Sequence, residues 1–145
     1  MTFAVRIPFV DYVGLELVSS GAGAAELAIM LREELCNSWS VAHGGVTMTL
    51  LDVAMAQAAR SPNQPGHATS GSVVTIEMKT SFMRPGIGRL LAQGRVLRRT
   101  ASMAFCEGSV FDDAQQLVAH ATGTFKYIRA LPAGGRRIQR SDASD

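Results

Sequence analysis

Residues 43–60 read HGGVTMTLLDVAMAQAAR, and this stretch predicts the element around which the fold is built. The paired glycines at its start and Arg60 at its end suit the two ends of a helix, because a cation is favoured near the helix C-terminus. Pro62 and Pro65 follow and are expected to end the helix. Apolar side chains lie nearly all round it, and a helix without a polar face is buried on most sides. We therefore expect a long helix that the rest of the chain encloses.

Four segments after the helix have the composition and alternation of β-strands. They are residues 73–83, 88–99, 102–111 and 116–129. In the first of them, Thr75 shares one face with Glu77, Lys79 and Ser81, and Ile76 shares the other with Met78, Thr80 and Phe82. A hairpin turn is expected at Asp112–Gln115. Because the connections are short, the four strands are expected to be antiparallel neighbours.

The segment before the helix is less clearly assigned. A short helix or turn is expected around Pro8–Tyr12, and the Gly-Ala-Gly of residues 21–23 indicates a turn. Residues 24–35, AAELAIMLREEL, contain many helix formers, yet apolar residues alternate from Ala25 to Leu31 as in a strand. On the residues alone both assignments stay open. The economical architecture is of the α+β class, with one curved antiparallel sheet around one helix.

Length and composition exclude several classes of protein. The chain has 145 residues, of which 47% are hydrophobic and 18% charged, and its formal net charge is +2. We expect a single domain over residues 1–130 and a flexible C-terminal tail over residues 131–145, which are rich in Gly, Ser and charge. No apolar run reaches the roughly 18 residues that span a bilayer. The charge is too small to suggest a nucleic-acid surface, so neither membrane nor nucleic acid is expected as a partner.

The cysteines, histidines and first residues point to a cytoplasmic protein without a metal site. Cys36 and Cys106 are the only cysteines and form no CxxC pair, as is usual in a reducing compartment. The first ten residues lack the basic and apolar regions of a secretory signal. The three histidines, His43, His67 and His120, do not have metal-ligand spacing.

Asp52 is the strongest single indication of function. It lies mid-helix between Leu51 and Val53, where a carboxylate without partners is costly to bury. The helix offers no nearby cation, since Arg60 is about two turns away. The alternative is that Asp52 shares a narrow exposed stripe with Gln57. We favour a functional carboxylate.

The start of the helix is a second candidate. Glycines at 44 and 45 let a ligand approach the backbone, and the first N–H groups of a helix lack intrahelical acceptors. Such an end can stabilise the oxyanion formed in acyl transfer. The alternative is a glycine turn with His43 as a capping or core residue. Asn37 could orient water or a carbonyl oxygen, or it could serve only the turn.

A mild basic cluster is a third candidate. It consists of Arg84 with Pro85-Gly86, together with Arg95, Arg98 and Arg99. The guanidinium groups could bind the phosphates of an anionic ligand. Alternatively, they could be solvated strand ends.

The spacing of Gly44 and Asp52 predicts a dimer. The two residues are eight positions apart on one helix, which corresponds to about 12 Å. They cannot both touch one carbonyl group. If both serve one reaction, Gly44 must meet the Asp52 of a second copy, which gives two equivalent sites across a two-fold axis.

With these residues in place, the sequence resembles the hotdog-fold acyl-CoA thioesterases, in particular their phenylacetate-pathway (PaaI-like) branch. The resemblance rests on Asn37, five residues, His43-Gly44-Gly45, six residues and Asp52. Residues 75–86, TIEMKTSFMRPG, and 117–128, LVAHATGTFKYI, resemble the family's second and last strands. The resemblance implies the hotdog fold, a long central helix wrapped by a curved antiparallel sheet of five to six strands. It also makes residues 24–35 a strand.

The resemblance further implies roles for individual residues. Asp52 would be the catalytic carboxylate, as general base for water or as nucleophile, and the Gly44 N–H would polarise the thioester carbonyl. Asn37 and His43 would help to set the water and the substrate, and Thr75 would hydrogen-bond near the carboxylate. The residues expected to bind substrate are Gly45, Phe82, Met83, Arg84, Pro85, Gly86, Arg99, Thr100, Ala101 and Ser102.

The function so implied is hydrolysis of an acyl- or aryl-CoA to free acid and CoA, without a metal or redox cofactor. The family forms homodimers, which commonly pair into homotetramers. At Thr100-Ala101 the sequence departs from a Gly followed by a basic residue, which the family often has there. Two other functions stay open, a non-catalytic acyl-CoA binding protein and a hotdog enoyl-CoA hydratase or dehydratase. Thiol release identifies hydrolysis, whereas hydration changes the absorbance of the enoyl group.

Overall fold

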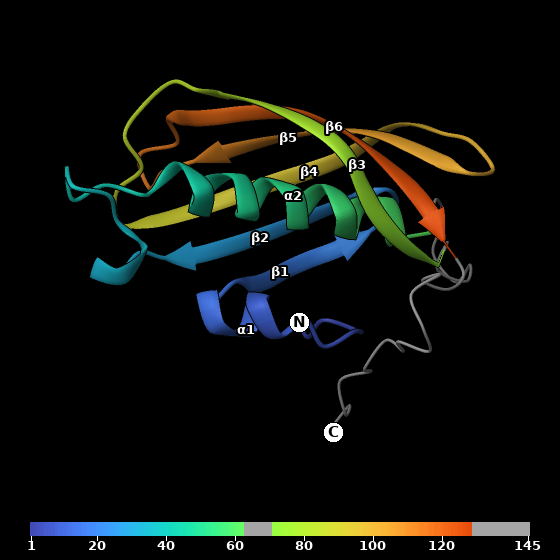
Figure 1. Cartoon of the computed structure of the whole chain (residues 1–145), viewed down its shortest axis with the longest axis horizontal. Coiled ribbons are helices and arrows are strands. Elements are labelled where there is room, and N and C mark those ends of the chain that lie inside the picture. Colours follow the sequence, from blue (N-terminus) through green and yellow to red (C-terminus); the bar gives the residue numbers. More distant parts are fainter. Residues whose placement is uncertain (63–70, 129–145) are drawn as a thin grey trace.

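The computed structural model describes residues 1–62 and 71–128, and in it one antiparallel sheet curves around one long helix (Figure 1). The elements in chain order are α1 (Pro8–Val13), β1 (Glu16–Gly21), β2 (Ala24–Met30), a 3₁₀ turn (Glu33–Leu35), α2 (Gly44–Arg60), β3 (Ser72–Phe82), β4 (Arg89–Arg99), β5 (Met103–Phe111) and β6 (Leu117–Ile128). The six strands lie in the order β1-β2-β4-β5-β6-β3. This is the hotdog architecture, so the predicted fold class is confirmed.

Helix α2 forms the centre of the core, as its apolar sequence predicts. Figure 1 shows it lying across the concave face of the sheet. The helix residues that are fully enclosed, with no exposed surface, are Leu50, Leu51, Ala54, Met55, Ala58 and Ala59. They pack against inward-facing side chains of every strand from β2 to β6, so burial of this helix and folding of the sheet are one event.

A row of small residues lets the sheet approach the helix closely. Ala25, Gly94, Gly108 and Ala121 are neighbours across four adjacent strands, from β2 to β6. A Cβ atom at Gly94 would lie 2.5 Å from the carbonyl oxygen of Ala54. Backbone therefore packs on backbone at this point, and only glycine permits it.

The two ends of α2 are held by side chains. His43 is the N-cap, and its Nδ1 accepts a hydrogen bond from the Gly45 N–H. At the other end, the Ser61 hydroxyl donates to the carbonyl of Ala58 and accepts from the N–H of Gly23. These bonds satisfy groups that a helix end leaves open. They confirm the predicted helix over residues 43–60; Pro65 lies outside the described residues.

The N-terminal part also matches its prediction, with one strand more than expected. Helix α1 ends at Val13 and is capped by Gly14, which has a φ of 88°. The Arg32 guanidinium donates to the carbonyls of Tyr12 and Val13. The unexpected strand is β1, which pairs with β2 through the turn at residues 21–23. A register shift between Leu17 and Ser19 interrupts its alternation, which explains why the pattern did not indicate a strand.

The segment 24–35 is a strand only in its first part. Strand β2 ends at Met30, and residues 33–35 form a 3₁₀ turn. The expectation that the whole segment is one strand is therefore wrong at its C-terminal end. The alternation that supports a strand stops there, because Arg32 turns back to cap α1.

The predicted order of the last four strands is wrong for β3. Strand β3 pairs with β6 and not with β4, whereas β4–β5 and β5–β6 are neighbours as expected. The free side of β4 is taken by β2, so β3 must use the other end of the sheet. Residues 83–88 make this crossing, and the carbonyl of Gly86 accepts from the N–H of Ala42 on the way. The hairpin turn at Asp112–Gln115 is confirmed.

The expected tail at residues 131–145 lies outside the described residues, so the domain boundaries stay a prediction. Within the described ranges, no helix combines the length and apolar character needed to cross a membrane.

Replacement of Gly94 by Ala should destabilise the protein by about 1–3 kcal/mol, because the added methyl group would collide with the backbone at Ala54. Urea unfolding of both proteins measures the difference. Gly21→Ala is the matched control, since a Cβ atom at Gly21 has no other atom within 4 Å. Equal losses for the two variants would show that the close approach does not constrain the fold.

Candidate active site

A pocket of about 270 Å³ opens at the N-terminal end of α2. Its lining residues are Asn37, Val41, Ala42, Gly44, Thr47, Phe82, Arg84, Pro85, Gly86 and Val118. They come from the loop before α2, the first turn of α2, the end of β3, the connection after β3, and β6. Six of them are residues that the sequence had singled out, namely Asn37, Gly44, Phe82, Arg84, Pro85 and Gly86.

Gly44 lines this pocket, and its backbone N–H has no partner in the described part of the chain. No acceptor for it is found among residues 1–62 and 71–128, whereas the next N–H, of Gly45, is bound by His43 Nδ1 at 2.9 Å. The ring of Phe82 stands over Gly44, where a Cβ atom would lie 3.4 Å from it. An open N–H at the positive end of a helix can bind the oxygen of a polarised carbonyl.

His43 caps the helix, which was one of the alternatives that the sequence left open for this residue. Because Nδ1 accepts from Gly45, a neutral His43 carries its proton on Nε2. The ring is exposed and does not line the pocket. A role in setting water or substrate stays a prediction for His43, and its Nε2 is the atom that could serve it.

Asn37 lines the pocket and also organises the loop before α2. Its Oδ1 accepts from the N–H groups of Trp39 at 2.9 Å and Val41 at 3.4 Å. Turn chemistry, one of the two alternatives for this residue, is thus confirmed. With Oδ1 occupied, the side-chain amide N–H₂ is the group that Asn37 can offer to a ligand.

Asp52 of helix α2 contacts Thr75 of strand β3. The Thr75 hydroxyl donates a hydrogen bond of 2.6 Å to Asp52 Oδ1. In the described part of the chain, no cation forms an ion pair with this carboxylate. The alternative of an exposed stripe shared with Gln57 is wrong, because Gln57 is only 7% exposed.

A β-bulge brings Thr75 to Asp52, which corrects the predicted faces of this strand. The register of β3 shifts between Thr75 and Glu77, so Ile76 is an extra residue. Thr75 then lies opposite Phe125, an inward-facing residue of β6, and not on the face of Glu77. Simple alternation had placed Thr75 on the same face as Glu77, Lys79 and Ser81.

Burial raises the pKa of the Asp52 carboxyl. Loss of water contact raises the pKa of the carboxyl above 3.8, and the hydrogen bond from Thr75 partly opposes this rise. A carboxylate with a raised pKa is a stronger base, and in its ionised form it can accept a proton.

The remaining residues expected to bind substrate divide into two groups. Gly45 and Met83 are next to pocket residues but do not line the pocket. Arg99 lies at the far end of β4, with its guanidinium 6.0 Å from the centre of the Tyr127 ring. Thr100–Ser102 form the following turn, in which Thr100 accepts from the N–H groups of Ser102 and Met103. Strand β4 separates this turn from the pocket by about 30 Å within one chain.

Four pocket residues were missed by sequence reasoning, Val41, Ala42, Thr47 and Val118. Thr47 lies one turn after Gly44, so helical periodicity could have indicated it. Val118 could not be found, because the pairing of β6 with β3 was not predicted. In the described ranges, no three His, Cys, Asp or Glu side chains are grouped as a metal site would need. The absence of a cofactor stays a prediction.

The comparisons with known proteins agree with this arrangement. The family model described as "Thioesterase superfamily" matches residues 40–119, more than half of the chain. The medium/long-chain acyl-CoA thioesterase YigI of Salmonella typhimurium is 28% identical over 135 residues, which cover 85% of this chain and 87% of YigI.

Two solved structures are similar to this chain in both sequence and fold. Conserved protein PA5202 from Pseudomonas aeruginosa is 31% identical, with a TM-score of 0.79 over 86% of this chain and 97% of that one. A mutant of the phenylacetic acid degradation protein PaaI from Thermus thermophilus is 27% identical, with a TM-score of 0.74 over 84% and 100% of the two chains. The chain belongs to the thioesterase superfamily, the hotdog-fold family of thioester hydrolases.

Proposed function

We propose that this protein hydrolyses acyl-CoA thioesters, with Gly44 and Asp52 at the reacting atoms. The observation that carries the proposal is the open N–H of Gly44 in a pocket at the start of the helix that also carries Asp52. An oxyanion donor and a base are the two groups that hydrolysis of a thioester requires. The acyl-CoA thioesterase name of the YigI relative supports CoA esters as the substrate class.

In the proposed reaction, the thioester carbonyl oxygen accepts from the Gly44 N–H. The dipole of α2 adds partial positive charge at this point, so negative charge on the oxygen is stabilised as it develops. Asn37 can hold the carbonyl or the water through its side-chain N–H₂. Neither interaction needs a metal or a redox cofactor.

Asp52 then activates the attack. As general base it takes a proton from water while the water oxygen bonds to the carbonyl carbon, and collapse of the oxyanion breaks the C–S bond. The departing CoA thiolate takes up the proton, and the products are a free acid and CoA. In the second route the carboxylate itself attacks, CoA thiolate leaves, and water hydrolyses the mixed anhydride. Thr75 holds Oδ1 in both routes and leaves Oδ2 for the reaction.

The two groups serve one substrate only if two copies share a site. Gly44 and Asp52 are about 12 Å apart along α2, too far for one carbonyl group. Strand β3 offers the contact, because it has eleven residues and lies at the edge of the sheet, where β6 is its only partner among the described strands. A long unprotected edge is suited to pair with another strand. We therefore propose a homodimer joined along β3 as the working unit, with pairing of dimers into a tetramer as a further step.

Replacement of Asp52 by Ala should lower kcat for acyl-CoA hydrolysis by about 10²–10⁴-fold, the usual contribution of a positioned base. Release of free CoA thiol measures the rate.

Asp52→Asn tests that the fold is intact. The folded-state pKa lies above 3.8, so ionised Asp52 costs stability that returns as the pH falls toward 3.8. We expect Asp52→Asn to be at least as stable as the parent at pH 7, with the difference fading in acid.

The pH profile gives the control for this prediction. The acid limb of kcat/KM should lie above pH 3.8 and move to higher pH in Thr75→Val, because the lost hydrogen bond had lowered the pKa of Asp52. An Asp52→Ala protein with the parent's activity would refute the catalytic assignment.

Complementation tests the shared site. Asp52→Ala and Gly44→Pro homodimers should each be nearly inactive, since the second change removes the N–H donor. A mixed dimer has one site with both lesions and one site with neither. Mixing and reassembly should therefore restore up to about half of the parent activity per mixed dimer.

If both residues served a site within one chain, every site in the mixture would carry a lesion and no activity would return. Mass measurement of the mixed dimer, with circular dichroism of Gly44→Pro, makes the absence of rescue decisive against the shared site.

Arg84 should bind the anionic CoA portion of the substrate. It lines the pocket, and its Nη1 is held by the carbonyl of Leu117 at 2.8 Å. Arg84→Ala should raise KM roughly tenfold with little change in kcat, because a distant anchor binds substrate and transition state alike. Arg95→Ala is the matched control, since Arg95 pairs with Glu107 on the outer face of the sheet. Unchanged KM in Arg84→Ala would reduce this arginine to a structural role.

A further inference from the structure

Trp39 is a large aromatic residue that the fold leaves in water. It is the only tryptophan of the chain, and it is 83% exposed. A side chain this exposed contributes little burial energy to the subunit that carries it. Tryptophan side chains are typically buried, either in cores or in contacts with ligands and partners.

The loop that carries Trp39 is ordered by hydrogen bonds. The Trp39 N–H donates to Asn37 Oδ1, the Ser40 N–H donates to the Asn37 carbonyl at 3.0 Å, and the Asn37 N–H donates to the Val41 carbonyl at 2.8 Å. Ser40 adopts a φ of 60°, which closes the turn. The indole is therefore presented by a fixed backbone.

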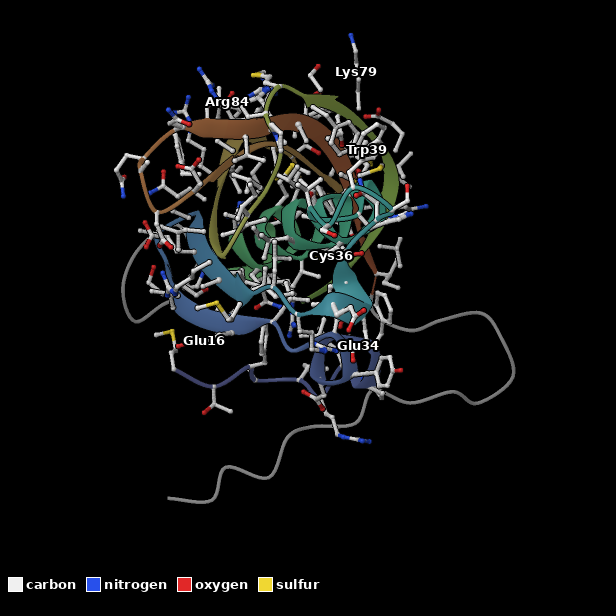
Figure 2. All side chains as sticks on the ribbon, turned by 90° about the vertical axis from the view of Figure 1, so that its left-hand side faces the viewer. Glu16, Glu34, Cys36, Trp39, Lys79 and Arg84 are labelled. Carbon is white, nitrogen blue, oxygen red and sulfur yellow. The ribbon has the colours of Figure 1, made fainter. Side chains whose placement is uncertain are left out.

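The position of Trp39 relates it to the pocket. Asn37 and Val41, on either side of it in the turn, both line the pocket, so the turn that carries Trp39 forms part of the pocket's rim. Figure 2 looks toward the end of the molecule where the helix begins, and it shows the labelled Trp39 and Arg84 on different sides of that end. One side of the rim thus carries a cation, and the other carries an indole.

We propose that Trp39 selects the acyl group of the substrate, by packing against acyl chains or rings that are large and apolar. This inference rests on the proposed function. With the thioester carbonyl at Gly44 and the anionic CoA toward Arg84, the acyl group is directed toward the uncharged side of the rim. Contact with Trp39 removes apolar surface of both groups from water, and its strength grows with the area of the acyl group. An acetyl group offers too little surface for this contact.

A series of esters with the same CoA portion tests the proposal. We compare acetyl-, butanoyl-, octanoyl- and phenylacetyl-CoA with the parent protein, Trp39→Ala and Trp39→Phe. Trp39→Ala should lower kcat/KM by about tenfold or more for the octanoyl and phenylacetyl esters and by less than about twofold for acetyl-CoA. Trp39→Phe should recover most of the loss. Tyr12→Ala is the matched control, because Tyr12 is 81% exposed on α1 and should leave all four values unchanged.

Fluorescence of the single tryptophan gives a readout that does not depend on turnover. In the Asp52→Ala protein, octanoyl-CoA should shift the Trp39 emission to shorter wavelength, because the indole leaves water. CoA without an acyl group should leave the emission unchanged.

Two results would overturn the proposal. An equal loss of kcat/KM for all four esters, with an emission shift caused by CoA alone, would show that Trp39 contacts the CoA portion. A change in the molecular mass of the assembly in Trp39→Ala, measured by light scattering, would show that Trp39 belongs to a subunit interface. If the parent protein releases thiol from none of the esters, the proposed function fails, and the emission of Trp39 with octanoyl-CoA and CoA still decides the contact.

Discussion

The close packing of the α2 backbone on the sheet is the constraint on which the rest of the structure depends. Gly94 lies so near to Ala54 that no side chain fits between them, and the neighbouring strands carry alanine or glycine in the same row. A sheet can approach a helix this closely only where its inner face carries no large side chains. Larger side chains on either side of the row, such as Leu27 and Phe125, then fill the space between the helix and the curved strands.

This placement of α2 also positions Gly44 and Asp52, the two halves of the candidate site, against strand β3. Strand β3 runs along the helix, so that Phe82 stands over Gly44 at one end and Thr75 reaches Asp52 at the other. Thr75 faces inward only because the bulge at Ile76 reverses the alternation there. The hydroxyl that orients the carboxylate thus depends on one extra residue in the strand. Such bulges often re-aim a side chain near functional sites.

Much of this could be read from the sequence, and the failures have a common cause. Apolar periodicity identified α2 and four of the strands, and the family resemblance added β2. The spacing from Asn37 to Asp52 selected residues of which two, Asn37 and Gly44, meet in one pocket. The position of β3 beside β6 and the inward face of Thr75 were not predicted. Both depend on strand pairing, which joins residues far apart in the chain, whereas alternation reports only on neighbours in sequence.

The incompleteness of the single chain follows from the same geometry. The helix that gives Asp52 its buried surroundings also holds it eight residues away from the Gly44 N–H, and the turn at residues 99–102 lies at the far end of β4. Antiparallel addition of a second copy along β3 reverses the direction of the partner's elements. In the dimer we propose, the Gly44 end of one helix therefore lies near the Asp52 of the other. The edge position of β3 and the divided site are then two consequences of one arrangement, because the strand at the edge of the described sheet is also the strand that contacts both Gly44 and Asp52.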